Sequence, residues 1–321
     1  MREAVFIRQN ADKWKTIEQD VQTRDPNVLS ERFVELTDDL AYARTFYPSA
    51  PVTQYLNTLT TRFHQQIYRN RREERGRFAR FWRQELPRLF RNSHRQLLFS
   101  FLIFAAAAGL GAVSALHDDT FVRLIMGDTY VNQTLENIER GDPMAVYKGA
   151  NATAMFLAIT FNNIRVAFTA FVLGALFSVG TVWVLFQNGV MLGAFQAFFY
   201  QKGLLLPSVL TIWIHGTLEI SAIVIAGCAG LVMGNSLLFP GTYPRLYSFQ
   251  KGARQGMKIA VGLVPIFIAA GFLESFVTRL PLHWAVSSGI IAASALFIGW
   301  YFVLYPIQLQ KSSPLSHESS R

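Results

Sequence analysis

Two ionisable side chains stand four residues apart in a strongly apolar stretch of the chain, TIWIHGTLEISAIV. This spacing places His215 and Glu219 on the same face of a helix, about one turn apart. A third ionisable side chain, Glu274, lies in a separate apolar stretch, AAGFLESFVT. An unpaired charge in hydrocarbon is costly, so these groups need hydrogen-bond partners, a counter-ion or water.

Three kinds of chemistry fit this arrangement. In a structural arrangement, His215 and Glu219 hydrogen-bond to each other and, through Asn188 or Glu274, to a neighbouring helix. In a relay, the histidine–carboxylate pair carries protons or ions, because such a pair can titrate near neutral pH. In a metal site, His215, Glu219 and Glu274 would be the ligands, although HxxxE differs from the HExxH spacing of zinc proteases. We expect the structural arrangement, with no metal ion and no cofactor.

Few other polar residues interrupt the apolar stretches. Glu274 also has a simpler interpretation, in which it lies near enough to the outer interface to reach water. The expected intramembrane polar cluster consists of Asn162, Asn188, His215, Glu219 and Glu274, with Asn163 as a further polar residue nearby.

Motifs of soluble enzymes are missing from the sequence. It contains no phosphate-binding glycine loop, no GxSxG and no HExxH. The single cysteine, Cys228, excludes an intramolecular disulfide and any multi-cysteine metal site. We therefore expect a protein that is not an enzyme.

Membrane-spanning helices must position the polar cluster. Hydrophobic residues make up 51% of the 321 residues and charged residues only 16%, against about 25% charged residues in soluble domains. Residues 1–95 carry 18 Lys or Arg and 12 Asp or Glu, whereas long apolar stretches dominate from Leu97 onward. We predict an all-α fold, a polytopic integral membrane helical bundle of about six membrane segments.

The expected segments follow the apolar runs within a transmembrane domain at 96–308. Asn151–Arg165 is expected as an amphipathic helix at the outer surface, and Gln187-Asn188-Gly189 as an interruption between two segments. A polar tail is expected at 309–321. The six segments are 97–116, 166–186, 188–203, 205–233, 260–277 and 284–305.

The region at 1–70 predicts a cytoplasmic group of three helices. Apolar residues recur at helical spacing in 30–46 and again in 52–67, and a shorter helix is expected at 9–22. Breaks are expected at Asp25-Pro26 and around Pro48 and Pro51, because proline interrupts helices.

Residues 71–95, RREERGRFARFWRQELPRLFRNSHR, predict a basic amphipathic helix. Such a helix, placed just before a membrane span, is typical of a helix that lies on anionic lipid of the inner leaflet. Arg-rich runs also fit nucleic-acid phosphates, but the apolar face leads straight into a span, so we expect no nucleic acid. The expected lipid-interface residues are Arg77, Arg80, Trp82, Arg83, Arg88 and Arg91.

The topology follows from the placement of Lys and Arg. Eleven Arg lie between Arg62 and Arg95, and the expected loop at 235–258 has four basic residues and no acidic one. The stretch 117–150 has six acidic and three basic residues. We therefore expect the N-terminus, the basic loop and the C-terminus in the cytoplasm. This requires 188–203 to cross, although it spans only about 24 Å of a core about 30 Å thick. A re-entrant 188–203 would place the basic loop outside.

Small residues recur at four-residue spacing in the apolar stretches, a pattern that lets helices approach closely. Most of them should serve packing within one molecule, and one such ridge could line a homo-oligomer interface. The expected packing glycines are Gly174, Gly189, Gly216, Gly230 and Gly234.

Three sequence blocks in this order resemble the stage II sporulation protein M family. They are FNNIRVAFTAFVLGALFSVGTVWVLFQNGVMLGAF, IHGTLEISAIVIAGCAGLVMG and IAAGFLESFVT, within residues 155–280. The resemblance implies a multi-pass protein of the bacterial or archaeal cytoplasmic membrane. It also implies a role similar to that of a scaffold, since the namesake recruits a peptidoglycan amidase and a lytic transglycosylase during engulfment.

Three functional hypotheses follow. The first is a non-enzymatic membrane scaffold that binds membrane or envelope proteins, which the missing catalytic motifs, the cytoplasmic helices and the resemblance all favour. The second is a transporter or channel that uses His215, Glu219 and Glu274, since broken helices often line transport sites. The third is an intramembrane metalloenzyme. We expect the scaffold.

Overall fold

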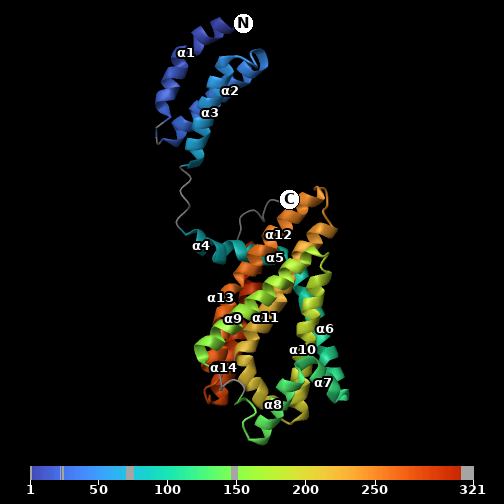
Figure 1. Cartoon of the computed structure of the whole chain (residues 1–321). Coiled ribbons are helices and arrows are strands. Elements are labelled where there is room, and N and C mark those ends of the chain that lie inside the picture. Colours follow the sequence, from blue (N-terminus) through green and yellow to red (C-terminus); the bar gives the residue numbers. More distant parts are fainter. Residues whose placement is uncertain (1, 22, 24, 70–75, 146–150, 312–321) are drawn as a thin grey trace. The chain divides into compact units, whose positions relative to one another are not determined.

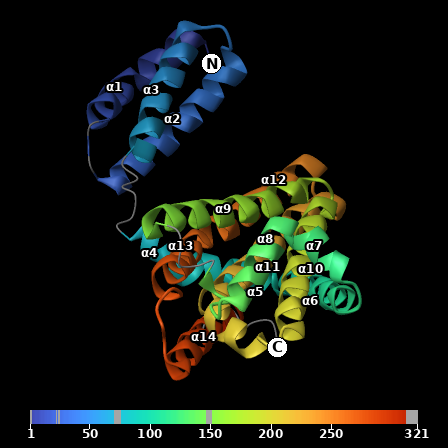
Figure 2. The ribbon, with the colours of Figure 1, turned by 60° about the horizontal axis from the view of Figure 1, so that its bottom comes forward.

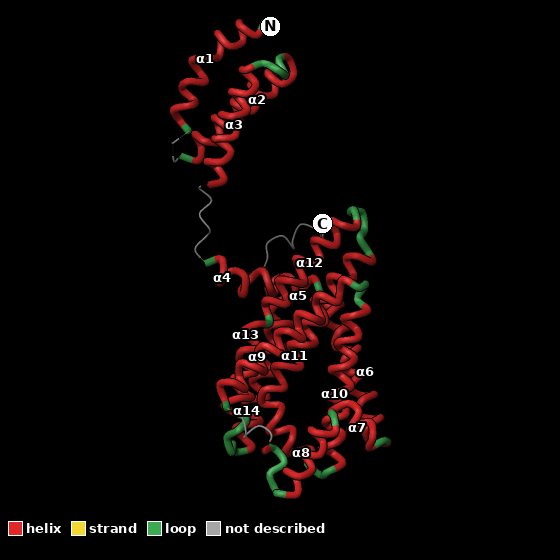
Figure 3. The backbone as a smooth tube through the Cα atoms, in the orientation of Figure 1, coloured by secondary structure: helices red, strands yellow, loops and turns green. Residues whose placement is uncertain are grey.

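The chain forms two compact units, Met1–Arg77 and Phe78–Arg321. The computed structural model describes every residue except 1, 22, 24, 70–75, 146–150 and 312–321. All regular secondary structure in the described part is helical (Figure 3), which confirms the predicted all-α fold. The first residues of the expected basic helix and most of the expected polar tail lie outside the described part.

The N-terminal unit is a group of three helices, α1 Glu3–Asp20, α2 Pro26–Phe46 and α3 Pro51–Arg69 (Figure 1). The expected break before α2 is confirmed, because Asp25 caps that helix by accepting a hydrogen bond of 2.9 Å from the backbone N–H of Asn27. All three helices contribute to one core, whose members include Trp14, Ile17, Leu36, Leu56, Leu59 and Phe63.

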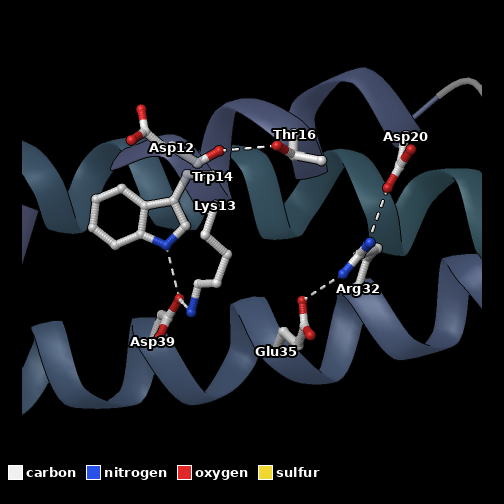
Figure 4. Close-up of polar contacts among 8 residues, drawn as sticks. All are labelled: Asp12, Lys13, Trp14, Thr16, Asp20, Arg32, Glu35 and Asp39. Carbon is white, nitrogen blue, oxygen red and sulfur yellow. Dashed lines mark hydrogen bonds and ion pairs between the residues drawn. The ribbon is translucent and has the colours of Figure 1, made fainter. Parts of the chain in front are cut away.

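Polar contacts join α1 to α2 above this core (Figure 4). Trp14 Nε1 donates a 2.7 Å hydrogen bond to Asp39 Oδ2, and the same carboxylate forms an ion pair with Lys13. Arg32 of α2 reaches back to Asp20 of α1 at 3.0 Å. Partly exposed pairs of this kind contribute at most about 1 kcal/mol each, so they set the register of the helices while the apolar core holds them together.

The second unit contains six helices that are long and apolar enough to cross a membrane, as far as the chain is described. This confirms the predicted bundle of about six segments. They are α6 His94–His117, α9 with η3 Ala152–Ala175, α10 Val179–Gln201, α11 Leu205–Leu238, the run α12–α13–η4 Arg245–Val277, and the run α14–η5–α15 Trp284–Lys311. The fifth span consists of α12 Arg245–Gly262, α13 Val264–Phe272 and η4 Leu273–Val277. The sixth consists of α14 Trp284–Gly299, η5 Trp300–Leu304 and α15 Tyr305–Lys311.

Helix α11 is the centre of the bundle (Figures 1 and 2). It packs against α6, α9, α10, α12, α13 and α14, and it is the most deeply buried of the spans. The last span is the least buried, because α14 contacts the bundle mainly through α11 and leaves most of its surface to the membrane.

The second and third spans differ from the prediction. The expected surface helix Asn151–Arg165 is wrong, because these residues form the first part of the span α9. The chain reverses at residues 176–178, where Phe177 and Ser178 adopt the left-handed conformation with φ of 51° and 68°. At about 1.5 Å per residue, the 23 residues of α10 reach about 35 Å, which is long enough to cross a core about 30 Å thick.

The polar triplet Gln187-Asn188-Gly189 does not interrupt a helix, contrary to expectation. It lies inside α10, where Asn188 Nδ2 donates a 2.8 Å hydrogen bond to Val184 O of the same helix. A polar triplet within an apolar run is typical of a loop, but here the Asn188 amide is satisfied inside the helix.

Two connecting regions are also more helical than expected. The acidic stretch 117–150 contains α7 Asp119–Met126 and α8 Asp128–Glu139. The expected basic loop 235–258 is wrong, because α11 continues to Leu238 and α12 begins at Arg245. Its basic residues are therefore exposed side chains of a helix rather than of a loop.

The described part of the basic amphipathic segment is one continuous helical run, α4 Arg77–Arg80, the π turn η1 Phe81–Glu85 and α5 Leu86–Asn92. The expectation that its apolar face lies on lipid is wrong for Leu86 and Phe90, which are 0% exposed inside the bundle. The bundle covers them: the ring of Phe90 lies 4.7 Å from that of Phe302, between centroids. The basic side chains face outward, and their binding to lipid stays a prediction. The exposed residues are Arg77, Arg80, Arg83, Arg88 and Arg91, while Trp82 is half-buried.

The basic segments gather at one end of the bundle. Lys258 Nζ of α12 forms a 2.9 Å ion pair with Glu85 Oε2, and Arg91 of α5 donates to Gln310 of α15. The acidic helices α7 and α8 lie at the opposite end (Figure 1). Four spans connect α5 to α12, as the positive-inside rule requires if both are cytoplasmic.

Site-specific labelling tests this topology. We expect Gln133→Cys, in α8, to react with an impermeant maleimide on intact cells, and Gln250→Cys, in α12, to react only after permeabilisation. Both side chains are exposed. Cys228→Ala provides the background, since Cys228 is the single native cysteine. Labelling of Gln250→Cys on intact cells would contradict the proposed orientation.

Several glycines let neighbouring backbones approach α11. A Cβ atom at Gly230 would lie 2.2 Å from Thr181 Oγ1 and 2.4 Å from Ala170 O. The expectation of a close approach is wrong for Gly216, where a Cβ would meet only side chains of its own helix at 3.8 Å. The other expected packing positions, where an added Cβ would lie within 2.7 Å of another atom, are Gly174, Gly189 and Gly234.

Gly230 and Gly216 of α11 form a matched pair for mutagenesis. Gly230→Ala should lower the free energy of unfolding by about 1–3 kcal/mol, because the added methyl group overpacks the contact with α9 and α10. Gly216→Ala should be neutral or stabilising by up to about 1 kcal/mol, because alanine is the better helix former. Thermal unfolding of both variants in detergent checks this. Equal effects would contradict the packing.

Candidate functional site

Helix α11 places a buried His215 and a half-buried Glu219 one turn apart. His215 is 3% exposed. Glu219 lies 14 residues after the first residue of α11 and 19 before its last, or about 21 Å and 28 Å along the helix axis at 1.5 Å per residue. Bulk water at either end is therefore far from this carboxyl group, so its partners must come from other helices.

The π-helical turn η4 supplies the partners of His215. The His215 Nδ1 atom lies 3.0 Å from Thr278 Oγ1, and the Nε2 atom lies 3.9 Å from Glu274 Oε1. The backbone N–H of Thr278 bonds to Leu273 O at 2.8 Å, a step of five residues that defines the π turn. Single π turns of this kind are frequent at functional sites, and here the turn brings Glu274 and Thr278 onto the same histidine.

These contacts fix the orientation of the imidazole. The Thr278 hydroxyl donates its only proton to Leu273 O at 3.1 Å. With its proton on Leu273 O, the hydroxyl accepts a hydrogen bond from His215, and this arrangement corresponds to the tautomer with a proton on Nδ1. The Nε2 atom then points its lone pair, or a second proton, toward Glu274.

Asn163 of α9 is the partner of Glu219. Its Nδ2 donates a hydrogen bond to Glu219 Oε1. The structural expectation joined His215 to Glu219 and, through Asn188 or Glu274, to a neighbouring helix. Each of the two residues is held from another helix, Glu274 lies 3.9 Å from His215, and Asn188 bonds to its own helix. The side chain of Asn162, which the sequence favours, is exposed.

Two residues of the site were missed by sequence reasoning. Asn163 was noticed as an intramembrane polar residue, but 151–165 was assigned to the outer surface, so no contact with α11 was expected. Thr278 stands four residues after Glu274, a spacing that places both on one side of a helical turn. That spacing was the available signal.

The cluster lines a cavity of about 410 Å³. Asn162, Asn163 and Asn188 contribute to its wall together with the three ionisable residues, and the lining continues to Tyr130 of α8. The cavity thus brings together all five residues of the expected polar cluster. Its described lining contains no Lys or Arg.

The electrostatics of the cluster require a neutralising partner. One ligand-type atom from each of His215, Glu219 and Glu274 lies within 4.8 Å of the other two. Two like charges 4 Å apart repel by about 4 kcal/mol at an effective dielectric constant of 20. Two ionised carboxylates are therefore unfavourable here unless a proton or a cation lies between them.

Comparison with known families assigns the helical bundle to a described family. The profile of the family described as Stage II sporulation protein M matches residues 100–279, more than half of the chain. The chain belongs to this family. The matched segment runs from within α6 to the end of η4, so it contains the whole polar cluster and leaves out the last span.

A second profile, described as a domain of unknown function, DUF8413, matches residues 4–69. This match covers the three helices α1, α2 and α3 of the N-terminal unit. No curated protein and no solved structure matches the chain.

Neighbouring asparagines test the contact between α9 and α11. Asn163→Ala should lower the free energy of unfolding by about 1–3 kcal/mol, because it removes the amide donor from the half-buried carboxyl group of Glu219. Asn162→Ala, one residue away and exposed, should change it by less than about 0.5 kcal/mol. Thermal unfolding in detergent gives both values. The double variant Asn163→Ala/Glu219→Ala should lose less than the sum of the single variants, and strict additivity would contradict the contact.

Proposed function

We propose that the protein is a non-enzymatic scaffold of the cytoplasmic membrane. In this proposal the N-terminal unit binds partner proteins and the helical bundle holds that unit at the membrane. The observation that carries the proposal is the modular organisation of the chain. A three-helix unit with its own core precedes the bundle and matches a different profile from the bundle.

The surface of the N-terminal unit supports a binding role. Phe46, at the end of α2, is 57% exposed, and its ring lies 4.6 Å from that of Tyr42 and 6.4 Å from that of Tyr47, between centroids. Exposed aromatic rings that are held by their neighbours are typical anchors of protein interfaces, because they bury much area at little entropic cost. We propose this aromatic group as the partner-binding surface.

The charge distribution supports the placement of this unit in the cytoplasm. The positive-inside rule assigns the end of the bundle that carries α5, α12 and α15 to the cytoplasm, together with both termini. The exposed arginines of α4, η1 and α5 would then face the anionic lipids of the inner leaflet. Membrane or envelope proteins are the expected partners, and the open surface of α14 leaves room for a second copy.

Photo-crosslinking on the full-length protein in native membranes tests the scaffold. A photoreactive residue at Thr45, which is exposed beside Phe46, should form adducts with a defined partner protein. Phe46→Ala should reduce these adducts at least tenfold, because the anchor is lost. Val34→Ala is the control, since Val34 is a 58% exposed residue elsewhere on α2. Adducts that persist in Phe46→Ala would contradict the proposed surface.

Transport is a second candidate, and the polar cavity favours it. A space of about 410 Å³ that contains two carboxyl groups and an imidazole could pass protons or small cations. In liposomes, transport predicts a cation or proton flux that Glu274→Gln abolishes. A flux equal to that of empty liposomes would support the scaffold instead.

A further inference from the structure

The site that the bundle builds around His215 is a candidate for a bound cation, independently of the scaffold proposal. We propose that His215, Glu219 and Glu274 bind one divalent first-row transition-metal ion, which joins α11 to η4. The ion would replace the proton that the two carboxyl groups otherwise need.

The geometry has the dimensions of a metal site. One donor atom from each of the three residues lies within 4.8 Å of the other two. Ligands bound to Zn²⁺ at about 2.0–2.2 Å are themselves separated by about 3.3–4.4 Å, depending on the bond angle. Small rotations of the carboxyl groups therefore suffice to bring all three donors onto one ion.

The donor types select the class of ion. One imidazole nitrogen with two carboxylates suits Zn²⁺, Mn²⁺ or Fe²⁺, whereas copper(I) prefers thiolate and thioether sulfur. The charges agree with this choice, because a divalent cation and two carboxylates are neutral together. Neutrality matters here because the described lining of the cavity provides no basic side chain.

The orienting contacts are a separate observation that points to a ligand. His215 Nδ1 lies 3.0 Å from the Thr278 hydroxyl, and Nε2 lies 3.9 Å from Glu274 Oε1. A separation of 3.9 Å falls within the range expected for two donor atoms bound to one ion, so a cation between Nε2 and the carboxylate would be bound by both. Asn163 orients Glu219 by donating a hydrogen bond to its carboxyl group. Metal-binding histidines and carboxylates typically carry such orienting partners.

The cavity beside the cluster provides the remaining requirements. Its volume of about 410 Å³ leaves space for water to complete the coordination of the ion. Its lining reaches α7 and α8, in a stretch of the chain with six acidic and three basic residues. The net negative charge of this stretch raises the local concentration of cations near the cavity.

Metal binding by the purified full-length protein tests the proposal. After chelation and addition of Zn²⁺ or Mn²⁺ alone, the wild type should retain about one ion per chain, and its melting temperature should rise by about 5 °C at saturating metal. His215→Gln, Glu219→Gln and Glu274→Gln should each weaken binding at least tenfold and remove the rise. The matched controls are His117→Gln and Glu136→Gln, whose side chains are exposed, and both should behave as the wild type.

A spectroscopic measurement keeps the test decisive if a cluster variant fails to fold. X-ray absorption of the Zn²⁺-loaded wild type should show nitrogen and oxygen neighbours at about 2.0–2.2 Å, with the outer-shell signal of one imidazole. Absence of the imidazole signal would overturn the proposal. So would a wild type that retains no ion, or retention that is equal in the wild type and all three cluster variants, since that would be adventitious binding.

Discussion

Hydrocarbon offers no hydrogen-bond partner, and this constraint governs how α11 is built into the bundle. The helix carries an imidazole and a carboxyl group far from either of its ends, so both must be satisfied by other helices. Thr278 of the chain after η4 holds His215, and Asn163 of α9 holds Glu219. The polar cluster therefore ties together three segments that are more than 50 residues apart in the sequence.

Close packing in the other half of α11 complements these polar contacts. Beyond the cluster, the helix presents Gly230 and Gly234 to the reversal between α9 and α10, where Gly174 and Ser178 lie against it. In a membrane, association between helices depends on van der Waals contact and hydrogen bonds, because lipid removes the hydrophobic driving force. The half of α11 around Gly230 and Gly234 thus packs through small residues, while the half around His215 and Glu219 is held by hydrogen bonds.

The N-terminal unit is stabilised instead by the burial of apolar side chains in its own core. Its core of Trp14, Ile17, Leu36, Leu56 and Phe63 is closed by three amphipathic helices, and its ion pairs are partly exposed. The two units are therefore stabilised by different interactions, an apolar core in the first and close packing with polar contacts in the second.

The amino-acid sequence by itself determined the all-α membrane class, the number of candidate spans, the N-terminal helices and the family. Each of these depends on local composition, length or a contiguous motif, which the chain displays without being folded. It did not determine where the second and third spans begin, because an asparagine looks like a loop residue until its partner is known. It also did not determine which of Asn162 and Asn163 contacts Glu219, or which residue holds His215, because the partners lie on other helices. Only the tertiary structure decided these contacts, since the rotation of α9 and the π turn at Glu274 depend on packing between distant helices.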